Sequence, residues 1–198
     1  MNQTLENILN RRSTRTFTDE KVDEEILKEI VKAGLYAPSS RNKQLWHFTV
    51  IQKKSLLEEL NNDTKNAVKK YAEEKISNTE MLSKLMSRAN NDAYDIFYKA
   101  PAAIIISKDT TDITSQDDCA VASENLMIAA ESFGYGSCWV SFIKCLFELD
   151  ETKAREYYEK FEIPENYLPT HAIVIGHKKN EHSKALARRE NTVKYILE

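Results

Sequence analysis

Glycine is scarce in this chain, which has only four in 198 residues, at positions 34, 134, 136 and 176. Phosphate-binding loops of the Walker and Rossmann types need closely spaced glycines, because the backbone must turn sharply and approach the phosphate. Gly134-Tyr135-Gly136 begins like the Rossmann fingerprint, but Trp139 stands where its third small residue should be. The sequence therefore predicts neither kind of loop, and a bound phosphate would have to be held by side chains.

Cysteine and histidine are also few and poorly placed for a metal. Cys119, Cys138 and Cys145 are odd in number, and their spacing fits neither a disulfide framework nor a zinc or iron–sulfur site. The four histidines, at positions 47, 171, 177 and 182, include no pair at the helical spacing that brings two rings to one ion. We expect buried thiols, structural imidazoles at His47 and His171, and no metal.

An excess of positive charge and long apolar runs are missing too. The 28 lysines and arginines face 31 acidic residues, for a formal net charge of −3. We therefore expect no nucleic-acid partner, because no domain-wide positive field is available. No apolar run reaches the length that crosses a bilayer, and the first residues lack the features of a secretion signal. We expect a cytoplasmic protein without a membrane partner.

Two short polar segments carry the strongest functional signal. Arg11-Arg12-Ser13-Thr14-Arg15 places three guanidinium groups where a first helix is expected to end, and guanidinium forks suit bidentate bonds to phosphate. Pro38 to Gln44, ahead of Trp46, strings hydroxyls and amides along a loop, where they can pair with a heteroaromatic ring edge or polyol hydroxyls. Each alone is more often plain surface or loop, but together and in this order they suggest a flavin site.

Hydrophobic periodicity predicts helices and strands alternating around one sheet. Asp23 is the expected N-cap of a helix that Pro38 stops, and Ser55 with Glu58 and Ser115 with Asp118 have the capping-box pattern. The expected helices are 5–9, 26–35, a short one from 55, 118–130 and 152–161, and the expected strands are 46–52, 101–106, 137–142 and 171–175. Residues 62–98 are polar with thin periodicity, and two interpretations are open: a solvated helical pair or, less often, a lid over a substrate pocket.

In their order along the chain, these pieces resemble the FMN-dependent nitroreductase family. Arg-Arg-Ser-x-Arg followed by Pro-Ser-Ser-x-Asn-x-Gln and Trp46-His47-Phe48 is similar to its amino-terminal signature. The stretches 118–130, 134–140 and 168–176 are similar to its central helix and later strands, and Ala187-Arg188-Arg189 to its carboxy-terminal phosphate contact. The resemblance covers nearly the whole chain and is weakest between about 62 and 98. It implies one α+β domain over residues 1–198, a three-layer α/β/α sandwich with a central mixed sheet, and a homodimer.

The resemblance also implies a function and a set of cofactor contacts. The expected activity is an FMN-dependent oxidoreductase that passes electrons from NADH or NADPH, by ping-pong hydride transfer, to nitroaromatics, quinones or similar small oxidants. No residue is assigned as catalytic, because the flavin carries the reaction. The expected cofactor-binding residues are Arg11, Arg12, Ser13, Arg15, Pro38, Ser39, Ser40, Asn42, Gln44, Trp139, Ser141, Phe142, Arg188 and Arg189.

The resemblance also implies roles for individual residues of this set, by the family positions that they match. Arg15 matches a family position beside the N1–C2 edge of the flavin, and the 38–42 loop is expected to reach the FMN of the other protomer. Ser141 and Phe142 replace the acidic residue and glycine that some members carry near N5. Two alternatives stay open: another flavin reaction on the same scaffold, such as dehalogenation or flavin fragmentation, and a non-catalytic flavin-binding module.

Overall fold

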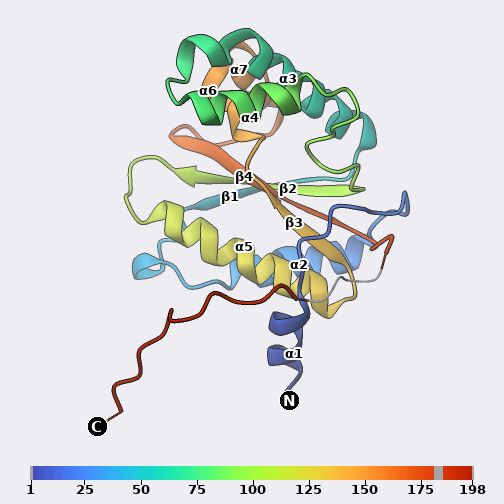
Figure 1. Cartoon of the computed structure of the whole chain (residues 1–198), viewed down its shortest axis with the longest axis vertical. Coiled ribbons are helices and arrows are strands. Elements are labelled where there is room, and N and C mark those ends of the chain that lie inside the picture. The colour runs from blue at the N-terminus through green and yellow to red at the C-terminus, as the bar shows by residue number, and fades with distance from the viewer. Residues whose placement is uncertain (1, 181–184, 198) are drawn as a thin grey trace.

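A four-stranded sheet lies between two layers of helices in the computed structural model, which describes residues 2–180 and 185–197 (Figure 1). The strands are β1 (Trp46–Ile51), β2 (Ala102–Asp109), β3 (Gly136–Val140) and β4 (Tyr167–Gly176), in the spatial order β1-β2-β4-β3. All neighbouring strands pair antiparallel. The expected mixed sheet is therefore wrong: across the described residues, parallel pairing is confined to an isolated bridge between Ser13 and Ser137, outside the four strands.

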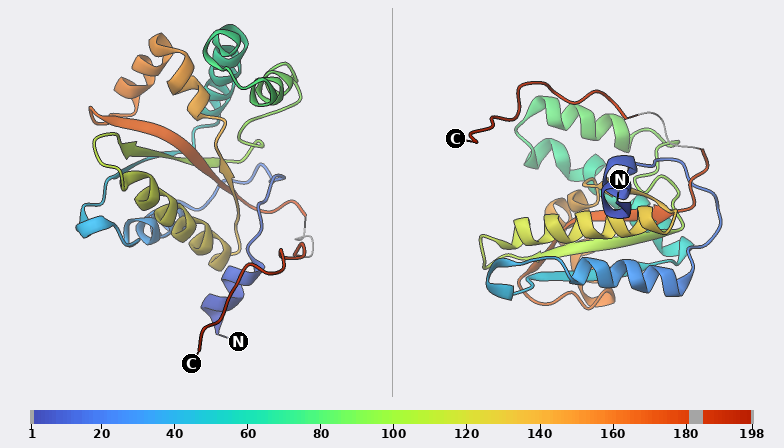
Figure 2. Two further views of the ribbon diagram at one scale, coloured as in Figure 1. Left: turned by 60° about the vertical axis from the view of Figure 1, so that its left-hand side comes forward. Right: turned by 90° about the horizontal axis from the view of Figure 1, so that it is seen from below.

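Helices cover both faces of this sheet. One layer consists of α3 (Lys54–Lys75), α4 (Thr79–Ala89), α6 (Lys144–Leu149) and α7 (Glu151–Lys160), and the other of α2 (Glu24–Leu35) and α5 (Ser115–Ser132). A separate hydrophobic cluster fills each interface between sheet and helices. The predicted three-layer α+β arrangement is confirmed. The helix α1 (Gln3–Asn10) and the tail 185–197 project from this body (Figure 2).

The apolar run in β2 explains why the sheet lies in the middle. Ile104, Ile105 and Ile106 are all fully buried. Successive side chains of a strand point to opposite faces, so Ile105 joins the cluster under α3 and α6 while its two neighbours join the cluster under α2 and α5. A strand buried on both faces was predicted here and is confirmed.

The two capping boxes predicted from sequence are wrong. α3 begins at Lys54, before Ser55, and α5 has Thr114 at its N-cap without a side-chain bond. Ser115 is buried and its hydroxyl donates to the carbonyls of Asp109 and Asp112 in the preceding loop. The N-cap of α2 is as predicted, because the Asp23 carboxylate accepts from the amides of Glu25 and Ile26. The spacing of Ser115 and Asp118 matches a capping box but does not show that the Ser115 hydroxyl bonds instead to carbonyls three and six residues earlier.

Residues 62–98 form most of α3, all of α4 and the loop that leads to β2. The predicted helical pair is present, but its inner side is core: Ala67, Val68 and Leu85 are buried in the cluster that covers the sheet. All three cysteines are buried, as predicted, and burial raises the pKa of the Cys119 thiol to about 12. Among the described residues, no helix is both long and apolar enough to cross a membrane.

Candidate cofactor site

The arginine-rich segment is fixed against the edge strand β3. Ser13 forms its bridge with Ser137, and the Thr14 amide donates to the Ser137 carbonyl at 2.9 Å. Gly136 permits this approach, because a Cβ atom at that position would lie 2.6 Å from the Thr14 hydroxyl. The segment is therefore held in place by backbone contacts.

The polar atoms of this segment include several that are buried without a hydrogen-bond partner. The Nη1 atom of Arg12 donates to the carbonyls of Leu9 (2.6 Å) and Arg11 (2.7 Å), where α1 ends. The Nε atom of Arg11 forms an ion pair with Glu124 of α5 at 3.5 Å, but without hydrogen-bond geometry. Within the described part of the chain, the buried atoms lacking a partner include Arg11 Nε, Arg12 Nε, Thr14 Oγ1 and Ser137 Oγ. Buried polar atoms normally have partners, so this concentration fits a bound anion such as phosphate.

Arg15 points from the same segment into a group of aromatic residues. Its side chain is exposed, and the guanidinium carbon lies 5.9 Å from the centroid of the Tyr98 ring. Hydrogen bonding with Tyr98 raises the pKa of Arg15 above its ordinary value, so the group is cationic at every pH of interest. Tyr98 is a residue that the sequence analysis missed.

The second predicted segment, Pro38–Gln44, is a strained loop. Arg41, Asn42 and Gln44 have φ angles of 55°, 55° and 54°, a region that favours glycine. Their side chains are exposed, and the Gln44 Nε2 atom donates to Asn42 Oδ1 at 3.0 Å. The amides therefore face outward, where they can contact a molecule that the loop itself does not enclose.

This loop is held by hydrogen bonds at three points. The amide of Ser40 donates to Oδ1 of Asp118 in the first turn of α5 at 3.0 Å, and Asp118 is buried. The Gln44 amide donates to the Ser39 hydroxyl at 3.0 Å. The third contact is the Lys43 side chain, which donates to Asp112 in an ion pair of 2.6 Å, and this contact holds the pKa of the carboxyl well below its usual range.

The two predicted segments do not meet within one chain at a common point. The loop contacts α5 at Asp118, whereas Arg11 contacts it at Glu124. These positions are six residues apart and therefore project about 120° from each other around the helix. The arrangement leaves the two segments on different faces of α5.

The strand β3 brings Trp139 and Ser141 to one small cavity. The Trp139 ring stacks on His171, with centroids 3.6 Å apart and planes 7° apart, and its Nε1 atom donates to the Ser141 hydroxyl at 2.9 Å. Both residues line a cavity of about 240 Å³ together with Lys108, Lys144 and others. Phe142 is not exposed there: it is buried in the opposite cluster, 6.1 Å from the Tyr94 ring.

His171 is a structural imidazole, as predicted. Its Nε2 atom lies 2.7 Å from the Ser123 hydroxyl, which donates to the Cys119 carbonyl, and its Nδ1 atom lies 2.8 Å from the Thr170 hydroxyl. Burial lowers the pKa of His171 to about 3. The ring is therefore neutral near pH 7, and its stacking contact helps to fix the Trp139 ring.

Arg188 and Arg189 lie in the exposed tail (Figures 1 and 2). The Nη1 atom of Arg188 is 3.5 Å from the Leu186 carbonyl, a contact within the tail. In the described structure no hydrogen bond or ion pair joins either arginine to the segment Arg11–Arg15. Their part in binding phosphate stays a prediction. The described residues also contain no group of three side chains placed to hold a metal ion.

A sequence profile described as the Nitroreductase family matches residues 8–177, most of the chain. The chain belongs to the nitroreductase family. The match includes the segment Arg11–Arg15, the loop Pro38–Gln44 and every strand of the sheet. The resemblance identified from the motifs is confirmed.

Individual members of the family agree with this assignment. A nitroreductase with bound FMN from Bacteroides fragilis superposes with a TM-score of 0.86 at 30% identity, over 99% of this chain and all of that one. An FMN-dependent nitroreductase from Clostridium difficile gives a TM-score of 0.79 at 26% identity, over 98% and 99% of the two chains. An FMN reductase (NADPH) from Bacillus subtilis is 28% identical over 91% of this chain and 68% of its own.

Three residues around the candidate site were not found from sequence. Tyr94 and Tyr98 belong to the polar stretch whose periodicity is weak, and no motif marks them. Asp118 was interpreted as part of a capping box, although its carboxylate holds the loop at Ser40 instead. An acidic residue in the first turn of a helix gives no indication of such a distant partner.

Proposed function

We propose that this chain is an NAD(P)H oxidoreductase that binds FMN and reduces small oxidants such as nitroaromatics or quinones. Family membership and the FMN-bearing neighbour at 30% identity support the class of enzyme and its cofactor. The observation that carries the proposal is the concentration of buried polar atoms without a hydrogen-bond partner on Arg11, Arg12, Thr14 and Ser137, of which Arg11 Nε has only its ion pair with Glu124. These donors and hydroxyls fit a phosphate group, and the sequence of this chain has no glycine-rich loop that would bind the phosphate instead.

Each part of the site then has a task. Arg11, Arg12 and Ser13 bind the phosphate from one end, and Arg15 places a permanent cation at the edge of the ring system. Trp139 and Ser141 line a separate small cavity, and in this proposal they limit the access of water to the flavin. When bound, FMN would supply the hydride and electron transfer between the nicotinamide and the oxidant. The protein contributes binding, orientation and charge.

A homodimer completes this proposal. α1 has no buried residue, and the tail 185–197 is exposed throughout. Exposed apolar side chains of this number usually mark an interface. They are Leu5, Ile8 and Leu9 in α1, and Leu186, Val193, Tyr195, Ile196 and Leu197 in the tail. We place the two-fold interface on these elements, so that the loop Pro38–Gln44 of one protomer reaches the FMN of the other.

The edge of the sheet offers a place for the tail. β1 is an outer strand, and grooves of about 370 and 310 Å³ flank it on either face. Leu27, Val31, Leu35 and Val50 give the first groove apolar walls. An extended segment with apolar residues can add to such an edge through backbone hydrogen bonds. The tail of the second protomer has this composition.

A visible spectrum of the purified protein tests the proposed activity. We expect a yellow protein that bleaches when NADH or NADPH is added without oxygen and recovers its colour on adding a nitroaromatic or a quinone. A yellow protein inert to both nicotinamides would instead support a flavin-binding module or an enzyme with another electron donor. A colourless protein that takes up no added FMN would overturn the proposal.

Removal of residues 185–197 tests the dimer. Light scattering should show a monomer, and FMN should bind poorly because half of each site is lost. The control carries Arg188→Ala with Arg189→Ala in the full-length chain, which should stay dimeric while its affinity for FMN falls. A truncated chain that remains a dimer would contradict the proposed interface.

A further inference from the structure

The loop between α4 and β2 has an unusual backbone. Tyr98 and Lys99 have φ angles of 56° and 55°, in the left-handed region that non-glycine residues seldom adopt. Such a conformation is energetically unfavourable, and it persists only where the surroundings fix it. The strain is located directly at Tyr98, the residue that meets Arg15.

Buried polar side chains of α3 fix this loop. The Lys65 ammonium, which is 6% exposed, donates to the carbonyls of Asn91 (2.8 Å) and Tyr94 (3.1 Å). Asn61 is also buried, and its Oδ1 atom accepts from the Ile96 amide at 2.9 Å. A lysine side chain is seldom buried unless its charge is paired or hydrogen-bonded. These bonds therefore indicate that Lys65 maintains the conformation of the loop.

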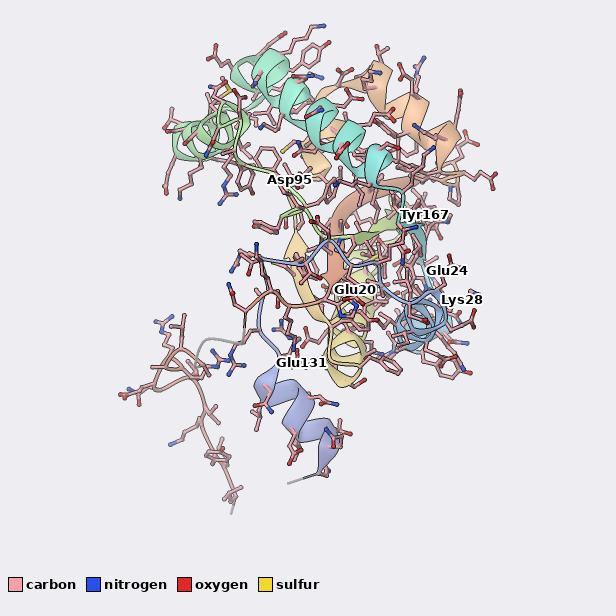
Figure 3. All side chains as sticks on the ribbon, turned by 90° about the vertical axis from the view of Figure 1, so that its right-hand side faces the viewer. Glu20, Glu24, Lys28, Asp95, Glu131 and Tyr167 are labelled. Carbon is pink, nitrogen blue, oxygen red and sulfur yellow. The ribbon has the colours of Figure 1, made fainter. Side chains whose placement is uncertain are left out.

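Asp95 holds the last turn of the loop. It is labelled in Figure 3, where the loop descends from the helical layer toward the sheet. Its carboxylate accepts from the amides of Phe97 at 2.8 Å and Lys99 at 3.1 Å. The two bonds bracket Tyr98 and keep its ring facing the segment Arg11–Arg15.

Aromatic contacts then connect Tyr98 with the rest of the site. Its ring meets Tyr94 edge to face at 6.2 Å, and Tyr94 meets Phe142 at 6.1 Å just beyond β3. Arg88 lies over the other side of Tyr94 at 5.8 Å. The Arg15 guanidinium, at 5.9 Å from the Tyr98 ring, ends this row.

We propose that Tyr98 is a positioning residue, which holds the Arg15 guanidinium toward the cofactor and so stabilises the negative charge that the flavin ring gains on reduction. This inference rests on the proposed function. An exposed arginine has many rotamers, and fixing one of them costs entropy. A cation over an aromatic face recovers part of that cost, and the braced loop keeps the ring in place before the cofactor binds.

The reduction potential of bound FMN tests the role of Tyr98. Tyr98→Leu should favour oxidised over reduced FMN by about tenfold, a potential about 30 mV more negative. Arg15→Gln should change the same ratio about 100-fold, or about 60 mV. Tyr98→Phe keeps the ring and its packing but loses the hydroxyl, so about a threefold change is expected.

Two comparisons separate positioning from a general effect. Tyr71→Leu removes another tyrosine ring that lies under cations, Lys70 at 4.9 Å and Lys75 at 5.7 Å, and should leave the potential unchanged. In the Arg15→Gln background, Tyr98→Leu should add no further shift, because the residue that it positions is gone.

The possible results are distinguishable. If wild-type protein takes up no FMN, the proposed function fails and this inference with it. If Arg15→Gln shifts the potential but neither Tyr98 variant does, the positioning role alone is wrong. An equal shift from Tyr98→Leu with and without Arg15 would also overturn it, since the tyrosine would then act on the flavin directly. If Tyr98→Leu does not fold, the reduction potential of the Tyr98→Phe variant tests the positioning role instead.

Discussion

The segment Arg11–Arg15 is fixed to β3 by a backbone bridge, whereas the loop Pro38–Gln44 is attached to α5 through the amide of Ser40. The first segment gathers buried polar atoms that lack partners. The second uses its polar groups to hold its own strained shape and turns its remaining amides outward. In the proposed function, the first segment is a preformed half-site, while the second serves a cofactor bound mainly by the other protomer.

The largest expected effect comes from the preformed half-site. Arg12→Ala with Arg15→Ala should weaken FMN binding by about 100-fold or more, because each charged contact contributes roughly 1.5–3 kcal/mol. The protein should remain folded, since α1, which Arg12 caps, has no buried residue. Fluorescence titration with FMN and circular dichroism measure the two quantities. Arg155→Ala, on the exposed side of α7, is the control, and full flavin affinity in the double variant would remove the phosphate argument.

Acid should act on β4, which pairs with the strand that anchors this half-site. The pKa of His171 is about 3 in the folded protein and near 6.5 when unfolded. Below pH 6.5 the His171 ring is protonated in the unfolded chain but stays neutral in the folded chain. The free energy of unfolding therefore decreases as the pH drops toward 3. At pH 5 the loss from this group is about 2 kcal/mol.

Urea unfolding at pH 7 and pH 5 measures that loss. His171→Gln lacks the titrating ring, so the difference in its unfolding free energy between the two pH values should be smaller than in wild type by about 2 kcal/mol. Equal differences in the two proteins would show that the ring becomes charged without cost in the folded state.

A smaller effect is expected where the loop is attached. Asp118→Ala removes the acceptor of the Ser40 amide, so the strained loop should relax and FMN should bind about tenfold more weakly. Asp117→Ala, at an exposed position in the same turn of α5, controls for the loss of an acidic residue there. If both variants bind FMN like wild type, the loop does not depend on Asp118.

The smallest expected effect, the loss of one FMN site in a mixed dimer, tests most directly whether the loop Pro38–Gln44 serves the FMN of the other protomer. In a mixed dimer with one chain carrying Ser40→Ala and Asn42→Ala, we expect chiefly one of the two FMN sites to be lost. The ratio of FMN to dimer, measured by titration of tagged and purified mixed dimers, should therefore fall from about two toward one. Equal weakening of both sites would contradict a site shared between protomers.

Much of the architecture followed from local pattern. The isoleucine run in β2 predicted a strand buried on both faces, and Asp23 predicted where α2 begins. Hydrophobic periodicity and helix caps are properties of residues near one another in sequence, so such features can be recognised in a single chain. The capping box at Ser115 and Asp118 failed because Ser115 bonds to carbonyls just before the helix and Asp118 bonds to the Ser40 amide, 78 residues away.

The sequence by itself determined the family, the sheet, and the two polar segments that face a flavin in the proposed function, because motifs and periodicity are local properties. Only the tertiary structure decided how those segments are used. Gly136 admits Thr14, Asp118 holds Ser40, and Lys65 braces the loop that presents Tyr98 to Arg15. These pairs are joined by packing across the fold, and the physical reason they escape the sequence is that a side chain's partner is set by three-dimensional proximity.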